Sequence, residues 1–188
     1  MKKLPLILLG VVALLALFGV SAYNSIQTKD EAAAAAKQQI EVQLQRRADL
    51  VPNLVETVKG FAKQEMTIFT EVAQARAGLA GAVRGGNVGE MARANDAMTG
   101  ALGRLLAIAE NYPQLKSDQN FLRLQDELSG TENRIAVART DYNGAVRDFN
   151  TYIRKFPAVI VAKLSGAAAR EYFEVQSEAA REVPKVSF

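Results

Sequence analysis

An uncharged apolar run near the N-terminus constrains this chain more than any other feature. Leu4 to Ala22 reads LPLILLGVVALLALFGVSA, without a single charged side chain. A helix rising about 1.5 Å per residue would carry this run across most of the roughly 30 Å hydrocarbon core of a bilayer. Backbone polar groups in lipid must be satisfied within the segment, so the run should be helical. It predicts a transmembrane anchor over residues 1–22 and a separate domain over residues 23–188.

A cleaved signal peptide is the alternative interpretation of the same run. Lys2 and Lys3 would form its basic n-region, and Val20-Ser21-Ala22 fits the small-residue cleavage pattern. The apolar run is longer than the about 7–15 residues of a signal core, which favours an uncleaved anchor. No cysteine follows the run, which excludes a lipoprotein anchor.

Charges around the run bear on its orientation. Lys2 and Lys3 favour an N-terminus in the cytoplasm, and Lys29 and Lys37 on the other side oppose it. The balance predicts a single-pass protein of the cell (inner) membrane with its domain outside the cytoplasm.

Residue types that are absent narrow the possible functions. The chain has no cysteine and no histidine, which removes thiol nucleophiles, the commonest general base and the commonest metal ligand. Without Lys2 and Lys3, 21 basic residues face 20 acidic ones, so the domain lacks the basic excess of a nucleic-acid-binding surface. We therefore expect no enzymatic activity, no metal, no cofactor and no nucleic-acid partner.

Strong helix formers and the absence of period-two alternation predict an all-α domain. The first helix of this domain is expected from about Tyr23 to Ala77. Pro52 should kink it or end it, with Asp49 helping to cap a restart. Its expected core stripe comprises Ile40, Leu44, Val51, Val55, Val58, Ala62, Phe69 and Val72.

Glycines mark the next boundary. Gly78 to Gly89 holds five glycines in twelve residues and is predicted to be a loop. Asn87, followed three residues later by Glu90, fits a capping pattern for a helix that ends at Tyr112-Pro113. The expected core positions of that helix are Met91, Ala94, Met98, Leu102, Leu105 and Ala109.

A heptad pattern gives the clearest periodicity of the chain. One seam reads Phe121, Leu128, Ile135, Tyr142, Phe149 and Phe156, and the other reads Leu124, Thr131, Ala138, Ala145 and Tyr152. Such a pattern predicts a long helix packed nearly parallel or antiparallel to its neighbours. The helix should end at Phe156-Pro157, before a shorter helix through Tyr172 and Phe173 and a polar tail from Glu182. The fold class expected is an elongated antiparallel bundle of long helices.

Two polar clusters interrupt these patterns. The first is Arg46 to Leu54 (RRADLVPNL). The second is Thr131 to Ile135 with Arg139, Tyr142 and Asn143. Glu132 and Arg139 are seven residues apart and share a helix face. These clusters could form networks that fix the register between helices, or a stripe that recognises a partner. Asp126-Glu127 and Glu110 are interpreted as surface charges, and Gly85-Gly86 lacks the flanking residues of a phosphate-binding loop.

These clusters also carry a resemblance to a known family. Tyr23-Asn24, the stretch from Gln43 to Glu65, Ala75-Arg76, the stretch from Asn111 to Asn150, Phe156-Pro157 and Tyr172-Phe173-Glu174 resemble the LemA family of bacterial membrane proteins. The resemblance implies one N-terminal transmembrane helix, an antiparallel bundle of long helices and no established enzymatic activity. Family descriptions also place the short N-terminus outside the cell, against the charge argument above.

Two departures from the family pattern stand out. Gln64 occupies a position where many members have histidine, which disfavours a metal role there. Leu164-Ser165-Gly166 stands where the family tends toward an aromatic-glycine-aromatic stretch.

The functional hypotheses belong to different classes. The leading one is a membrane-anchored helical scaffold or protein-interaction module without catalytic activity, bound to lipid through its N-terminal helix and to a protein partner or another copy. The first alternative is a ligand-binding or hydrolytic bundle that uses buried Glu and Arg residues such as Glu132 and Arg139. The second is a self-assembling protein that shapes the envelope.

Overall fold

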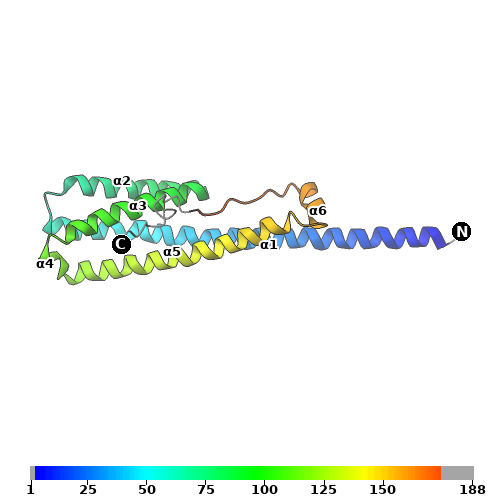
Figure 1. The fold of residues 1–188 in the computed structure, drawn as a ribbon, viewed down its shortest axis with the longest axis horizontal. Coiled ribbons are helices and arrows are strands. Elements are labelled where there is room, and N and C mark those ends of the chain that lie inside the picture. Colours follow the sequence, from blue (N-terminus) through cyan, green and yellow to red (C-terminus); the bar gives the residue numbers. More distant parts are fainter. Residues whose placement is uncertain (1–2, 175–188) are drawn as a thin grey trace, which may run out of the picture. The chain divides into compact units, whose positions relative to one another are not determined.

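The computed structural model describes residues 3–174, which contain six helices and no strand (Figure 1). The helices are α1 (Lys3–Phe61), α2 (Met66–Gly85), α3 (Val88–Ala109), α4 (Pro113–Lys116), α5 (Gln119–Tyr152) and α6 (Ala158–Ser165). These residues form two compact units. Unit 1 contains residues 3–38 and 140–171, and unit 2 contains residues 39–139 and 172–174. The prediction of an all-α bundle behind a long apolar helix is confirmed.

The apolar run forms the first part of α1 and is unpacked. Its large side chains are exposed, as Ile7, Leu9, Leu14 and Leu17 show at 62%, 71%, 68% and 68%. α1 is the one helix among the described residues that contains a stretch long and apolar enough to cross a membrane. Burial begins at the end of the run, where Ala22 and Ile26 are 2% and 1% exposed. The run therefore has the exposed apolar surface that lipid would cover.

The helix end expected at Pro52 as one of two alternatives is wrong, because α1 continues through it to Phe61, and the alternative of a kink stays a prediction. Proline has no N–H to donate to the carbonyl four residues earlier, which here belongs to Ala48. Arg76 of α2 compensates for this loss, since its Nε–H donates to the Ala48 carbonyl oxygen over 2.8 Å. A side chain from a neighbouring helix thus satisfies the acceptor that Pro52 leaves open.

The first helix boundary and the predicted glycine loop also need correction. The chain breaks at residues 62–65 instead of after Ala77, and α2 then runs through most of the glycine-rich stretch to Gly85. Burial of Phe69, Val72 and Leu79 on one face of α2 outweighs the low helix propensity of its glycines. Only Gly86 and Asn87 separate α2 from α3.

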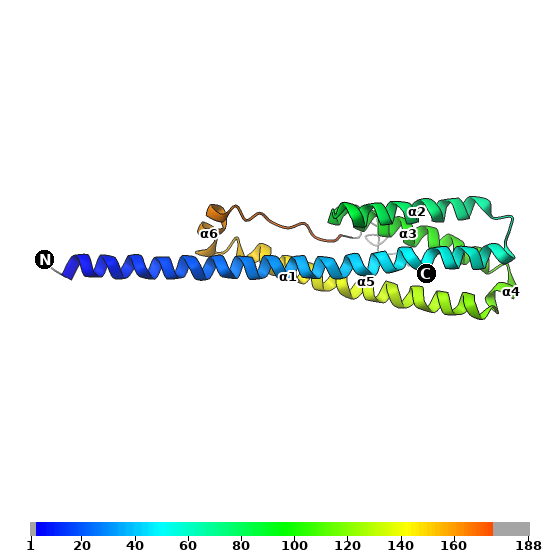
Figure 2. The same cartoon turned by 180° about the vertical axis from the view of Figure 1, so that it is seen from behind.

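Both linker residues have a local reason. Gly86 ends α2 in the left-handed conformation (φ 69°), which glycine adopts without a Cβ penalty. Asn87 caps α3 by accepting a hydrogen bond from the backbone N–H of Glu90 over 2.8 Å, as predicted. α2 and α3 consequently form a tight antiparallel hairpin (Figure 2).

Unit 2 contains all of α2, α3 and α4, the C-terminal part of α1 from Gln39, and most of α5. Its long segments run alternately in opposite directions (Figure 1). The expected α1 stripe is buried except at Val55, where Leu54 takes the core position instead. The expected α3 positions are buried except for Ala94, and the α5 seams hold from Phe121 to Ala138 in this unit and on to Tyr142 in unit 1. The core of unit 2 is therefore the one that the heptad pattern indicates.

The α5 pattern shifts beyond Tyr142. The next buried residues are Val146, Phe149 and Ile153, at steps of four, three and four, whereas Ala145 and Tyr152 are only partly buried. An extra step of four is a stutter, which turns the buried stripe away from the strict seven-residue repeat. Phe156, the last predicted seam residue, is 81% exposed and lies beyond the end of α5. Of the seam residues predicted beyond Tyr142, Phe149 is buried as expected, whereas Ala145, Tyr152 and Phe156 are not buried.

Unit 1 packs α6 and the end of α5 against α1. Ile26, Phe149, Ile153 and Ala162 form one buried cluster. α6 ends at Gly166, which adopts the left-handed conformation (φ 72°), and the helix predicted through Tyr172 and Phe173 is absent, because residues 167–174 are not helical. The predicted polar tail from Glu182 lies outside the described residues.

A polar clamp, formed by Asp30, Tyr142, Asn150 and Arg170, fixes this non-helical segment. Arg170 makes a bidentate contact with Asp30 of α1, at 2.7 Å from Nε to Oδ1 and 2.9 Å from Nη2 to Oδ2. The Asn150 side chain accepts from the backbone N–H of Arg170 and donates to its carbonyl oxygen. The Tyr142 hydroxyl donates to the carbonyl of Glu171 over 2.7 Å. Side chains thus satisfy the backbone groups that a helix would otherwise pair.

Candidate functional site

Arg47 is the most deeply buried charged residue of the described chain, at 5% exposure. Positions 40, 47 and 54 of α1 form one heptad seam, and positions 44, 51 and 58 form the other. Arg47 therefore occupies a core position between Ile40 and Leu54. An arginine at such a position should have partners, because an unpaired buried charge is strongly unfavourable.

Two neighbouring helices provide those partners. Nη1 of Arg47 donates to Oδ1 of Asn95 on α3 over 2.6 Å, and Asn95 is itself 6% exposed. The same Nη1 lies 2.7 Å from Oε2 of Glu132 on α5, whose side chain is 46% exposed. Nε of Arg47 is buried without a hydrogen-bond partner among the described residues. We call Arg47, Asn95 and Glu132 the polar layer of unit 2.

Two effects act in opposite directions on the pKa of Arg47. Loss of hydration lowers the pKa of Arg47 from its usual range, and the negative charges of Glu132 and Asp96 act in the opposite direction. Arginine starts from so high a pKa that it stays charged. The layer consequently links α1, α3 and α5 through one desolvated positive charge.

A groove lies beside the polar layer, with a volume of about 400 Å³. Leu102 and Leu106 of α3 and Leu128 of α5 supply its apolar lining, and Arg47 and Glu132 supply its charges. Thr99, Gln125 and Ser129 add polar groups. An apolar groove with a few convergent polar groups has the general composition of a small-ligand site.

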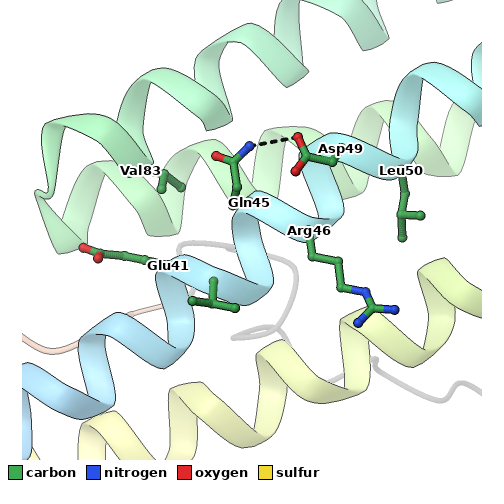
Figure 3. A pocket seen from close by; sticks show the side chains of 7 residues that line it. Glu41, Gln45, Arg46, Asp49, Leu50 and Val83 are labelled. Carbon is green, nitrogen blue, oxygen red and sulfur yellow. Dashed lines mark hydrogen bonds between the residues drawn. The ribbon is translucent and has the colours of Figure 1, made fainter.

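A second groove, of about 500 Å³, runs along α1 and reaches Val83 of α2 (Figure 3). Its apolar residues are Val42, Leu50 and Val83, and its polar residues are Glu41, Gln45, Arg46 and Asp49. We call it the α1–α2 groove. Gln45 donates to Asp49 over 2.8 Å, and Figure 3 shows this pair projecting from α1 towards α2. Val42 is 58% exposed. An apolar strip with a charged rim is the usual anatomy of a protein-docking surface.

The polar clusters predicted from the sequence are distributed between these features. Arg46 lines the α1–α2 groove, but in Figure 3 its side chain points away from α2, and it pairs with Glu127 of α5 over 2.9 Å. Glu110 pairs with Lys116, so it is the surface charge that was expected. Glu132 does contact a buried arginine, but that arginine is Arg47 and not Arg139. The pairing follows from tertiary packing, which a shared helix face cannot indicate.

Asn95 was missed, although the sequence contains a signal for it. It lies between Met91 and Met98 on the buried face of α3, at the spacing of a core residue. The seam of α1 likewise assigns Arg47 to the core. Two polar residues at core positions of different helices are expected to meet, because each needs a partner.

No group of three or more Asp or Glu side chains in residues 3–174 has the arrangement needed to hold a metal ion. The prediction that the chain binds no metal stays a prediction.

Comparison with known proteins covers most of the chain. The model of the LemA family matches residues 36–188. Magnetosome protein MamQ 2 of Paramagnetospirillum magneticum (strain AMB-1) is 31% identical over 189 residues, which cover 88% of this chain and 69% of that protein. Magnetosome protein MamQ of Magnetospirillum gryphiswaldense (strain MSR-1) is 31% identical over 174 residues, covering 80% of this chain and 64% of that protein. The polar layer and the α1–α2 groove both lie within the matched residues.

Proposed function

This chain belongs to the LemA family, and from that premise we propose that it is a membrane-anchored, non-catalytic scaffold whose bundle presents the α1–α2 groove to a protein partner or to a second copy. The observation that carries the proposal is α1 itself. One uninterrupted helix has exposed large apolar side chains at its start and contributes core residues to the bundle farther along. A tether continuous with the domain is suited to presenting that domain at a membrane surface.

Residues 1–22 serve as the anchor in this proposal, and residues 23–188 form the domain. The anchor crosses the cell (inner) membrane once. Lys2 and Lys3 keep the N-terminus in the cytoplasm, which leaves the bundle outside it. Cleavage after Ala22 would release the domain, so the size and membrane partition of the mature chain distinguish an anchor from a signal peptide.

The α1–α2 groove supports the interaction role by its composition. Val42, Leu50 and Val83 give it an apolar strip, and the rim combines acidic and basic side chains. The partner expected is therefore a protein segment with an apolar ridge and charges of both signs, rather than a nucleic acid.

Single cysteines provide a direct test, because the natural chain has none. Val42→Cys would carry a maleimide photocrosslinker in the full chain in native membranes. Ala107→Cys, exposed on α3 away from this groove, is the matched control. We expect discrete adducts from position 42 and none from position 107, and an adduct of twice the chain mass would identify a second copy. If position 42 yields no adduct of either kind, the interaction role is wrong.

The same cysteine at position 42 reports on which side of the membrane the bundle lies. Labelling of position 42 by a membrane-impermeant maleimide in unlysed cells, once any outer barrier is opened, supports a bundle outside the cytoplasm. Protection until lysis places the bundle inside and overturns that part of the proposal.

A ligand-binding function is the second candidate, and one observation favours it. Nε of Arg47 is a buried donor without a hydrogen-bond partner among the described residues, and Arg47 lines the groove between α3 and α5. A carboxylate with an apolar tail would match the arginine and the leucines of that groove. Octanoate is a suitable probe. If it binds the natural chain but not Leu102→Trp, which fills the groove, the ligand-binding function is supported, and equal binding to both chains contradicts it.

A further inference from the structure

The region around α6 exposes large apolar side chains that the fold leaves uncovered. Phe156, Ile160 and Leu164 are 81%, 52% and 84% exposed. Ile160 and Leu164 are one turn apart on α6 and share a face, and Phe156 precedes the helix by two residues. Single exposed apolar residues are ordinary, but three large ones within nine residues concentrate exposed apolar surface in one segment, which calls for a cover. We call these three residues the α6 patch.

The opposite face of α6 is docked on α1. Ala158 and Ala162 are 5% and 2% exposed, and Ala162 packs in the cluster that contains Ile26. Figures 1 and 2 both show α6 beside α1. The small alanines bring α6 close to its neighbours, while the bulky residues of the patch face outwards.

The docking point places α6 at the end of the apolar run. Ile26 follows Ala22 by four residues, which corresponds to about 6 Å along a helix axis. Tyr23, between them, is 46% exposed, and tyrosine is enriched where a membrane-spanning segment meets the headgroups. α6 consequently lies at headgroup depth if the run spans a bilayer.

The chain segment around α6 is basic. From Phe149 to Arg170 the chain contains four basic residues and no acidic one. Arg170 is engaged with Asp30, whereas Arg154, Lys155 and Lys163 are exposed. Basic side chains beside an apolar patch are typical of helices that lie on anionic membranes.

We propose that α6 is a second membrane contact, in which Phe156, Ile160 and Leu164 insert into the interfacial layer and Arg154, Lys155 and Lys163 bind anionic lipid headgroups. This inference rests on the proposed anchoring of residues 1–22. The α6 contact goes beyond the anchor because it fixes the unit that contains α6 against the bilayer. With the anchor alone, that unit could turn freely about one helix.

The test uses single-cysteine chains, full length, in vesicles of phosphatidylcholine and phosphatidylglycerol. A fluorophore is attached at Leu164→Cys, at Val12→Cys within the anchor, and at Ala107→Cys on α3. Lipids brominated near the headgroup or deep in the acyl chain then quench fluorophores that lie at those depths. We expect deep quenching at position 12, shallow quenching at position 164 and none at position 107.

Each other outcome has a separate meaning. Quenching at position 12 but not at 164 overturns the α6 contact and leaves the anchor intact. Absence of quenching at position 12 shows that the anchor itself has failed. If position 164 is not quenched at high protein density and becomes quenched when the protein is diluted in excess lipid, a second copy covers the patch. This result would also overturn the proposal.

A charge variant measures the lipid preference. Lys155→Gln with Lys163→Gln should lower the docked-to-undocked ratio of α6 by about fivefold per lysine in anionic vesicles. Lys116→Gln, on α4, is the matched control for a surface lysine and should leave the ratio unchanged. Equal quenching at position 164 in anionic and neutral vesicles, for both the natural and the charge-variant chains, would contradict the headgroup contact.

Discussion

Asp30, two heptads before Leu44, and Arg47 both fall on the heptad seams of α1, one in each unit, and the two units accommodate them differently. In unit 1, the side chain of Asp30 is 41% exposed and makes a bidentate contact with Arg170. In unit 2, Arg47 has an exposure of only 5% and meets Asn95 and a half-exposed Glu132. Asp30 keeps part of its hydration, whereas Arg47 has lost nearly all of it.

The difference lies in what each residue holds in place. Asp30 secures residues 167–171, which include three consecutive alanines and are not helical, so polar contacts supplement the limited apolar packing of these small side chains. Arg47 lies among well-packed helices that have apolar contacts in abundance. A charge there adds little stability, and its best-attested use is to fix the register of the helices. One polar seam residue therefore serves attachment, and the other serves alignment.

The sharpest way to break this comparison is to remove the counter-charge of Arg47. Glu132→Gln leaves a buried guanidinium with a weaker partner, which should lower the free energy of unfolding by about 3 kcal/mol. Urea titration of the full chain in detergent, followed by far-UV circular dichroism, measures the loss. The matched control is Glu127→Gln, which removes an exposed pair with Arg46 and should cost less than about 1 kcal/mol. Equal losses in the two variants would refute the distinction.

Replacing the buried partners together should have the opposite result. Arg47→Met with Asn95→Leu substitutes apolar side chains for both, and such replacements are often neutral or stabilising. If the polar layer aligns the helices, this variant keeps its stability but shows more than one set of amide resonances in an NMR spectrum. A single set of resonances would argue against the alignment role.

The core of unit 2 could be predicted from the sequence because it depends on periodicity within single helices. The α5 seams from Phe121 to Tyr142 and the α3 stripe needed only the spacing of apolar residues. The stutter after Tyr142 could not be predicted in the same way. Ala145 and Val146 are both apolar, and the choice between them depends on which neighbour α5 meets at that level.

The features that sequence reasoning missed involve contacts between distant residues. Pro52 predicts a break only if the Ala48 carbonyl stays unsatisfied, and the donor comes from Arg76, 28 residues away. Glu132 finds Arg47 on another helix rather than Arg139 on its own. The glycines of α2 predict a loop by local propensity, and tertiary burial of one face overrides that preference. Pairings of this kind cannot be read from one sequence.

A double-mutant cycle tests the compensation at Pro52. Arg76→Ala removes the donor to Ala48 and should cost about 1–2 kcal/mol of unfolding free energy, because a buried acceptor loses its partner. In a Pro52→Ala background the backbone N–H of residue 52 can bond to Ala48, so the same substitution should cost much less. The coupling expected from the two urea titrations is about 1 kcal/mol. Additive losses would show that Arg76 acts elsewhere.

The smallest expected effect concerns Asp30 and depends on pH. The hydrogen bonds from Arg170 lower the pKa of Asp30 below its ordinary value. A carboxyl group whose pKa is depressed by folding stabilises the native state above its unfolded pKa of about 3.9, and this contribution is lost as the pH falls through the lower folded value. Asp30→Asn should therefore cost about 1 kcal/mol near neutral pH, a small value because the pair is partly exposed.

The measurement is the stability difference between the natural chain and Asp30→Asn at several pH values. It should stay constant from pH 7 down to about 5 and shrink below about 4, where the natural aspartate becomes protonated. Asp148→Asn, exposed in the same unit and outside the clamp, is the control for general charge effects. A difference close to zero at every pH would mean that the non-helical segment is held by Asn150 and Tyr142 alone. The attachment role would then belong to neutral hydrogen bonds, and the contrast with the charged polar layer of unit 2 would become sharper still.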